Sequence, residues 1–124
     1  MSFACPACYA KDRKARGRPI AAMQSIQQPL AEMAARIEAA RWLVYHTAFL
    51  RDQGQSIQYD SSMAKLFASQ VAVDVTRLAM QVHGAYGTIK SLPLERLYRD
   101  AKMTEIYVGI SEVHRSIIAS RLIS

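Results

Sequence analysis

Residues 27–52 read QQPLAEMAARIEAARWLVYHTAFLRD, and this stretch decides the fold. Apolar residues recur in it at spacings of three and four, the pattern of one buried helix face. Pro29 is tolerated only near a first turn, so the pattern predicts a helix over 27–52, which Gly54 ends. The predicted inward face holds Leu30, Met33, Ile37, Ala40, Val44 and Ala48, and Trp42, Tyr45 and Phe49 lie on a neighbouring stripe.

Three further helices are predicted downstream. The second covers 62–83, and Gly84 is suited to follow it in the left-handed conformation. Pro93 favours the start of a short helix over 94–103, and a last helix covers 111–122. No window shows sustained alternation of period two, which strands would require. The predicted fold class is therefore all-α, an up-down helical bundle.

The composition is that of a single globular domain. The chain has 124 residues with 51% hydrophobic and 21% charged side chains. No apolar run reaches the ~18–20 residues that span a bilayer, and the N-terminus lacks the apolar core of a secretory signal. Integral membrane and secreted proteins are therefore not expected. We expect residues 1–10 to be a flexible segment and residues 11–124 to form the helical domain.

The positive charge is concentrated near the N-terminus. Of a net charge of +6, the first twenty residues hold +4, because five basic side chains oppose Asp12 alone. Such a cluster suits a phosphate-bearing partner such as a nucleic acid, a nucleotide cofactor or an anionic lipid. The alternative is a solvated arm without a ligand. The five are Lys11, Arg13, Lys14, Arg16 and Arg18.

The two cysteines, Cys5 and Cys8, form a C-P-A-C arrangement. A structural zinc site needs four ligands, and no second CxxC or nearby histidine pair supplies them. A thioredoxin-like motif is expected within a βαβ unit, which the sequence does not predict. We therefore interpret the pair as reduced and without function, which favours a cytoplasmic location.

No catalytic or metal constellation stands out elsewhere. HExxH is absent, and no ExxH pair repeats as a di-iron bundle would require. His46, His83 and His114 lie on separate predicted helices, and surface, capping or core hydrogen-bonding roles are expected for each. The sequence predicts neither a metal site nor a nucleophile.

Several short stretches, in this order, resemble the C-terminal helical domain of the acyl-CoA dehydrogenase family. Members are flavoproteins that carry FAD and desaturate acyl-CoA thioesters between the α and β carbons, a step of fatty acid metabolism. The resemblance runs from about Tyr9 to Leu122, and its specificity lies in the ordered set rather than in one motif. The stretches are RKARG at 13–17, LAEM at 30–33, IEAAR at 37–41, SMAK at 62–65, QVHGAYG at 81–87, RDAK at 99–102 and IYVGISE at 106–112.

The resemblance implies a set of FAD contacts. Arg13 would reach the FAD pyrophosphate of a neighbouring subunit, a task that suits the planar fork of a guanidinium. Gln24 and Gln81 would contact the flavin nucleotide, and Gly84 would let the backbone approach it closely. Ser111 would begin a helix whose N-terminal amides face the cofactor. A nucleotide cofactor then explains the basic segment better than nucleic acid does.

Four departures limit what the resemblance implies about catalysis. Many members carry a catalytic glutamate in a tyrosine-glutamate-glycine triplet, and here the triplet is Tyr107-Val108-Gly109. Valine cannot accept a proton, so we expect no catalytic residue at this position. Ile110 stands where the family has threonine. We also expect the domain's first helix, where some members place their base, and the family's other domains to be absent.

Two functions follow from these observations. The chain is either a fragment or small subunit that supplies FAD contacts to an acyl-CoA oxidoreductase, or a non-catalytic assembly module that has lost FAD. A bundle that lacks one helix exposes an apolar groove, and exposed apolar patches mark partner surfaces. We expect a homo-oligomer, or a hetero-oligomer with a longer dehydrogenase-like chain. Acyl-CoA would bind only if that partner completes the site.

Overall fold

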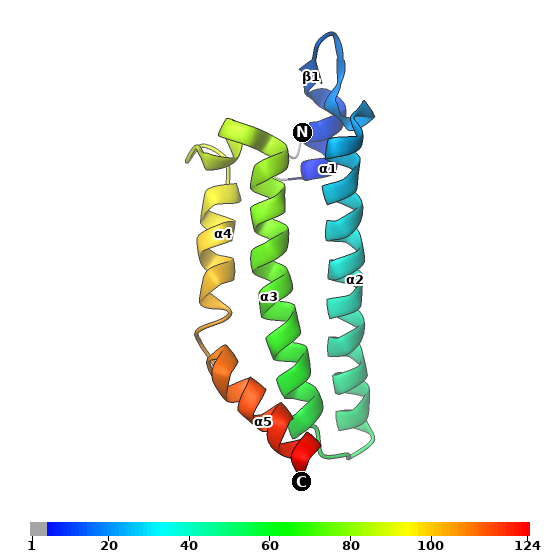
Figure 1. Ribbon diagram of the computed structural model, residues 1–124, viewed down its shortest axis with the longest axis vertical. Helices are drawn as coiled ribbons and strands as arrows, with labels where there is room; N and C mark the ends of the chain where they lie inside the picture. The colour runs from blue at the N-terminus through cyan, green and yellow to red at the C-terminus, as the bar shows by residue number, and fades with distance from the viewer. Residues whose placement is uncertain (1–4) are drawn as a thin grey trace.

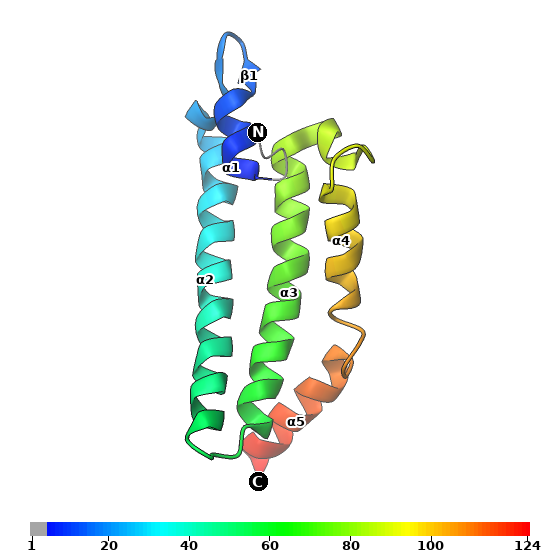
Figure 2. The ribbon, with the colours of Figure 1, turned by 180° about the vertical axis from the view of Figure 1, so that it is seen from behind.

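The computed structural model describes residues 5–124 as a helical bundle, as predicted. The two long helices lie side by side and antiparallel, and the two shorter helices follow each other along the far side of α3 (Figure 1). Figure 2 shows from behind that α3 lies between α2 and the α4–α5 pair. The elements are α1 Pro6–Asp12, β1 Lys14–Ala15, β2 Arg18–Pro19, η1 Ile20–Ala22, α2 Gln24–Asp52, α3 Gln58–His83, η2 Gly84–Thr88, α4 Leu94–Met103 and α5 Ser111–Ile123.

The two long helices agree with their predicted ranges more closely at their ends than at their beginnings. α2 ends at Asp52 and α3 at His83, as expected. Each begins three or four residues earlier than expected, so Pro29 lies inside α2 rather than in its first turn. Gly84 has a positive φ of 59°, as expected, but its ψ of −138° places it outside the left-handed helical region. Glycine adopts this conformation at little cost because it has no Cβ.

The N-terminal segment differs from the expectation of flexibility over residues 1–10. Residues 1–4 lie outside the described part of the chain. Pro6–Asp12 forms α1, and Ala10 at its centre is fully buried against the bundle. The helix is stable there because burial of its apolar side adds to the hydrophobic core. The basic cluster therefore begins within an ordered element, with Lys11 in the last turn of α1.

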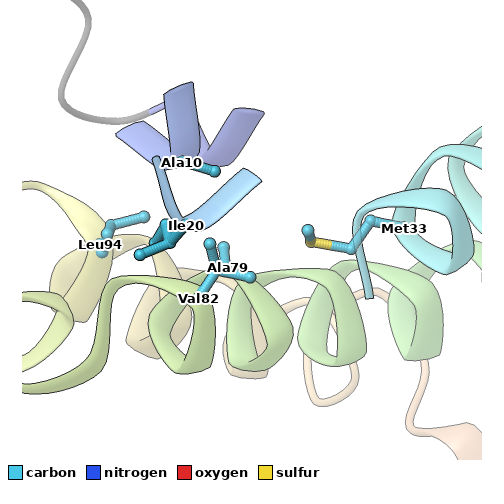
Figure 3. Close-up of a cluster of buried hydrophobic side chains, with 6 residues drawn as sticks. All are labelled: Ala10, Ile20, Met33, Ala79, Val82 and Leu94. Carbon is cyan, nitrogen blue, oxygen red and sulfur yellow. The ribbon is translucent and has the colours of Figure 1, made fainter. Parts of the chain in front are cut away.

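The core lies at the end of the bundle where the N-terminal elements meet the long helices (Figure 3). Met33 of α2 and Val82 of α3 contribute to it, and Leu94 at the start of α4 is almost completely buried. This cluster fixes α1, η1 and the beginning of α4 relative to α3. Its buried members are Ala10, Ile20, Met33, Ala79, Val82 and Leu94.

The distal half of α2 is poorly covered. Met33 and Ala40 of the predicted inward face are buried, whereas Ile37 and Val44 are exposed. The aromatic stripe beside them is more exposed still, with 64% of Trp42 accessible. The prediction that part of the apolar face is exposed is confirmed for Ile37 and Val44. None of the helices within residues 5–124 is long and apolar enough to cross a membrane.

Candidate functional site

A short β-hairpin positions Arg13. β1 and β2 pair antiparallel with Lys14 opposite Pro19 and Ala15 opposite Arg18, which leaves a two-residue loop. Both loop residues, Arg16 and Gly17, have positive φ, as the favoured tight hairpin turn requires. The Ile20 N–H donates to the Arg13 carbonyl at 2.8 Å, so the residue is fixed at the base of the hairpin.

The exposed side chain of Arg13 projects over Tyr86 of η2. Its Cζ lies 5.4 Å from the centroid of the Tyr86 ring, a cation–π contact. This contact places the guanidinium at a cavity of about 410 Å³ between α1 and the η2 region. In addition to these two residues, Tyr9, Asp12, Ile89 and Leu92 line the cavity.

A ring stack holds the two walls of this cavity together. The rings of Tyr9 on α1 and His83 at the end of α3 are stacked, with centroids 4.1 Å apart. His83 is buried, and its Nδ1 lies 2.7 Å from the Ala79 carbonyl oxygen, so the expected core hydrogen-bonding role is confirmed. The stack therefore attaches α1 to the end of α3 that leads into η2.

Gln81 and Gly84 lie at the same end of the bundle as Arg13. They line a second cavity of about 460 Å³, on the other side of η2. Nothing lies within 4 Å of the position that a Cβ on Gly84 would take, so the backbone there is open to a ligand. The structure thus brings three of the five predicted cofactor contacts around one short helix.

Gln24 and Ser111 do not join this group. Gln24 is the exposed first residue of α2 and lines neither cavity. Ser111 is buried at the first position of α5, next to a loop tied to α3 by Lys65, whose Nζ donates to the Gly109 carbonyl at 2.7 Å. Lys65 and Gln81 are 16 residues apart on α3, which is about 24 Å along a helix.

The Tyr107-Val108-Gly109 triplet lies in that distant loop. Val108 has a φ of 54°, and 78% of its side chain is exposed. The triplet borders a third cavity of about 330 Å³ against α3, which Lys65 and Ser69 also line. No proton acceptor stands at position 108, so this cavity has no carboxylate base from the triplet.

His114 lies beside the Tyr107-Val108-Gly109 triplet, a position that the sequence did not predict. Its Nε2 lies 3.3 Å from the Val108 carbonyl oxygen, and a Cβ on Gly109 would approach this nitrogen to 2.9 Å. Its Nδ1 is buried, with no hydrogen-bond partner among the described residues. The ring therefore supports the turn that presents Val108. Tyr86 was also missed, because its contact with Arg13 spans 73 residues of sequence.

Comparison with known proteins gives a consistent result. The family model "Acyl-CoA dehydrogenase, C-terminal domain" matches residues 6–123. An acyl-CoA dehydrogenase of Bacillus subtilis is 52% identical over 93% of the chain, and an acryloyl-CoA reductase (NADH) of Anaerotignum propionicum is 51% identical over 90%. The chain spans 30% and 28% of the lengths of these two relatives.

Solved structures agree with the sequence comparison. The butyryl-CoA dehydrogenase of Megasphaera elsdenii superimposes with a TM-score of 0.94 at 40% identity, over 96% of this chain and 31% of that one. The similarity therefore extends over nearly every described element, including α1 and η2.

Proposed function

This chain belongs to the acyl-CoA dehydrogenase family as its C-terminal helical domain, and we propose that it supplies FAD contacts and an oligomer interface to an oxidoreductase acting on acyl-CoA. The observation that carries the proposal is the placement of Arg13. An ordered hairpin holds its guanidinium, exposed, over Tyr86 at the edge of a cavity. Gln81 and Gly84 lie on the opposite side of the same short helix.

The residues around η2 fit a dinucleotide phosphate. Arg13 takes part in none of the ion pairs found within residues 5–124, so its charge is not neutralised by a neighbouring carboxylate. A guanidinium in this state can make paired hydrogen bonds to phosphate oxygens. Asp12 also lines the cavity, and its carboxylate would need to point away from a bound phosphate. Gly84 would allow close backbone approach.

FAD, when bound, supplies the hydride-accepting chemistry. The chain's own residues bind and orient: Arg13, Gln81 and Gly84 around η2, Gln24 at the same end of the bundle but outside the two cavities, and Ser111 at the start of α5. The side chain of Val108 removes no proton, because an isopropyl group has no lone pair to accept it. A base for an acyl-CoA substrate would have to come from another position or another chain.

The separation of the candidate contacts supports assembly. The loop before Ser111 is bonded to Lys65, which lies about 24 Å along α3 from Gln81. Two groups so far apart suit contacts with different subunits' cofactors, with Arg13 reaching a neighbour. The exposed α2 face, with Trp42, Tyr45 and Phe49, provides the apolar surface for a homo-oligomer or for a hetero-oligomer with a longer dehydrogenase-like chain. Acyl-CoA enters only a site that such a partner completes.

The cellular setting follows from the same proposal. The chain has only two cysteines, too few for the disulfide framework typical of small secreted proteins, which supports a cytoplasmic location. The role there is in fatty acid metabolism.

Absorbance in the flavin region tests the cofactor. The purified 124-residue chain is measured alone and after addition of FAD and gel filtration, and retained flavin is expected. Arg13→Ala should weaken FAD binding about tenfold or more, since a hydrogen bond to a charged group contributes about 1.5–3 kcal/mol. Arg18→Ala is the matched control, because Arg18 lies on the same hairpin but lines neither cavity beside η2.

A second function is favoured by one observation, the exposed valine in the triplet. If Val108 and Ile110 reflect loss of the flavin site, the chain is a non-catalytic assembly module. Absence of FAD retention in the wild type, together with stable association, would support this second function and refute FAD binding by the chain on its own. Retained flavin that acyl-CoA reduces would refute the second.

A further inference from the structure

The start of α1 brings the two cysteines into contact. Cys5 is the N-cap residue, and its Sγ accepts a hydrogen bond from the Cys8 N–H at 3.4 Å. Pro6 occupies the first helical position, where its fixed φ suits a helical turn. The capping sulfur therefore lies over the turn that carries the second thiol. The sequence alone could not show this arrangement.

The two thiols have different properties. Hydrogen bonds from the Cys8 thiol and backbone N–H to its sulfur lower the pKa of Cys5 below its usual value. The same thiol–thiol hydrogen bond raises the pKa of Cys8, which retains its proton. Cys5 is half-buried and Cys8 is exposed, so reagents in solution can reach the pair. Because the thiolate is the nucleophile, Cys5 is expected to react first.

We propose that Cys5 and Cys8 form a reversible dithiol–disulfide couple that exchanges with low-molecular-weight disulfides such as glutathione disulfide. The Cys5 thiolate attacks one sulfur of glutathione disulfide, whose S–S bond breaks and releases one glutathione thiolate, which takes up a proton. Cys8 then loses its proton and attacks Cys5 Sγ in the mixed disulfide, which expels the second glutathione. The protein pair is oxidised by two electrons, and glutathione disulfide is reduced by two.

The surroundings favour pairing within one chain. The rest of α1 is held by the burial of Ala10 and by the Tyr9–His83 stack, so Cys8 has a fixed support. Cys5 lies before the helix in extended conformation, with φ −90° and ψ 108°, and its side chain already points back to Cys8. Within residues 5–124, no third histidine, cysteine or carboxylate joins the pair as a metal site would require. The two thiols therefore suit redox exchange with each other better than metal binding.

Mass spectrometry of the intact chain tests the couple. The reduced protein is equilibrated in buffers of increasing glutathione disulfide to glutathione ratio, quenched with acid and alkylated. We expect loss of both alkylatable thiols in a monomer that carries no glutathione, and recovery of both on adding reductant. In Cys8→Ala the reaction should stop at a glutathione adduct on Cys5, because the resolving thiol is gone.

Cys5→Ala is the matched variant, and it should form its adduct more slowly than Cys8→Ala does, because backbone N–H groups still stabilise the Cys5 thiolate when the Cys8 side chain is removed. Peptide mapping of the wild type after brief iodoacetamide treatment should show Cys5 modified before Cys8. Wild-type protein that accumulates two glutathione adducts, or a disulfide-linked dimer on a non-reducing gel, would overturn the proposal. Equal or faster reaction of Cys8 would also overturn it. Circular dichroism of each variant confirms that the bundle is intact.

Discussion

His114 Nε2 lies 3.3 Å from the Val108 carbonyl oxygen and supports a turn in which a β-branched residue has a φ of 54°. A side chain in this region costs roughly 1–2 kcal/mol, whereas glycine there loses about 0.5–1 kcal/mol through its greater freedom when unfolded. Val108→Gly should therefore raise the free energy of unfolding by about 0.5–1 kcal/mol in urea denaturation. The exposed valine side chain loses few contacts on removal.

Ile110→Gly is the control for that substitution. Ile110 is two residues away at a φ of −64°, where a side chain has no such conflict, so glycine should destabilise the chain. Equal destabilisation by both substitutions would show that the turn is not strained at Val108.

Gly87 lies against the backbone of α3 and should not tolerate a side chain. A Cβ there would lie 2.7 Å from the Met80 carbonyl oxygen and 2.8 Å from Met80 Cα. Backbone cannot move as a flexible side chain can, so Gly87→Ala should lower the free energy of unfolding by about 1–3 kcal/mol. Gly54→Ala is the comparison, because Gly54 has a positive φ but open space around it, and its cost should stay near about 1 kcal/mol. Thermal and urea unfolding measure the stability of both variants. A smaller loss of unfolding free energy for Gly87→Ala than for Gly54→Ala would contradict the close packing of η2 against α3.

The Arg13–Tyr86 contact should be measurable by a double-mutant cycle. The variants are Arg13→Gln, Tyr86→Leu and the pair, each unfolded in urea. An exposed cation–π contact contributes about 0.5–1 kcal/mol, so the coupling energy should fall in that range. Additive effects of the two substitutions would mean that Tyr86 does not position the guanidinium.

Local signals in the sequence predicted most of the helices. α4 was predicted at its observed bounds, and the ends of α2 and α3 were correct because helical periodicity stops there before Gly54 and Gly84. The predicted starts of α2 and α3 lie three or four residues too late in the sequence, because Met23 and Ile57, the observed N-cap residues, make no side-chain capping bond. Without a capping side chain, these two starts lacked one of the signals that mark the beginning of a helix.

The arrangement of the candidate site residues was harder to predict from the sequence than the helices were. Arg13, Gln81 and Gly84 came from a resemblance, and nothing local in the sequence showed that they share one end of the bundle. That arrangement depends on the Tyr9–His83 stack, which joins residues 74 positions apart. Likewise, the hydrogen bond between Cys5 and Cys8 depends on a helix start that the expectation of a flexible segment had excluded.

Arg36 links α2 to α3 through Asp74 and also pairs with Glu32 on its own helix. All three side chains are more than a third exposed, so the free energy that the interhelical pair contributes is small. Asp74→Asn should lower the free energy of unfolding by less than about 1 kcal/mol, and the loss should shrink in high salt. Glu38→Gln, which breaks a pair within α2, is the matched comparison and should cost about 0.3–0.5 kcal/mol. A loss that does not change with salt would assign the effect of Asp74 to packing rather than to charge.

Trp42, the single tryptophan, reports on whether the α2 face is an interface. It is 64% exposed, and its ring meets Tyr45 edge-on at 6.2 Å. If a second copy covers this face, the emission of Trp42 should shift to shorter wavelength as protein concentration rises, in step with the sedimentation coefficient. Phe49→Glu places a charge beside the same surface, where 59% of the phenylalanine is exposed, so it should abolish both changes while leaving the fold intact. A stable monomer at micromolar concentration, with unchanged emission in both proteins, would show that this face is not a self-association surface.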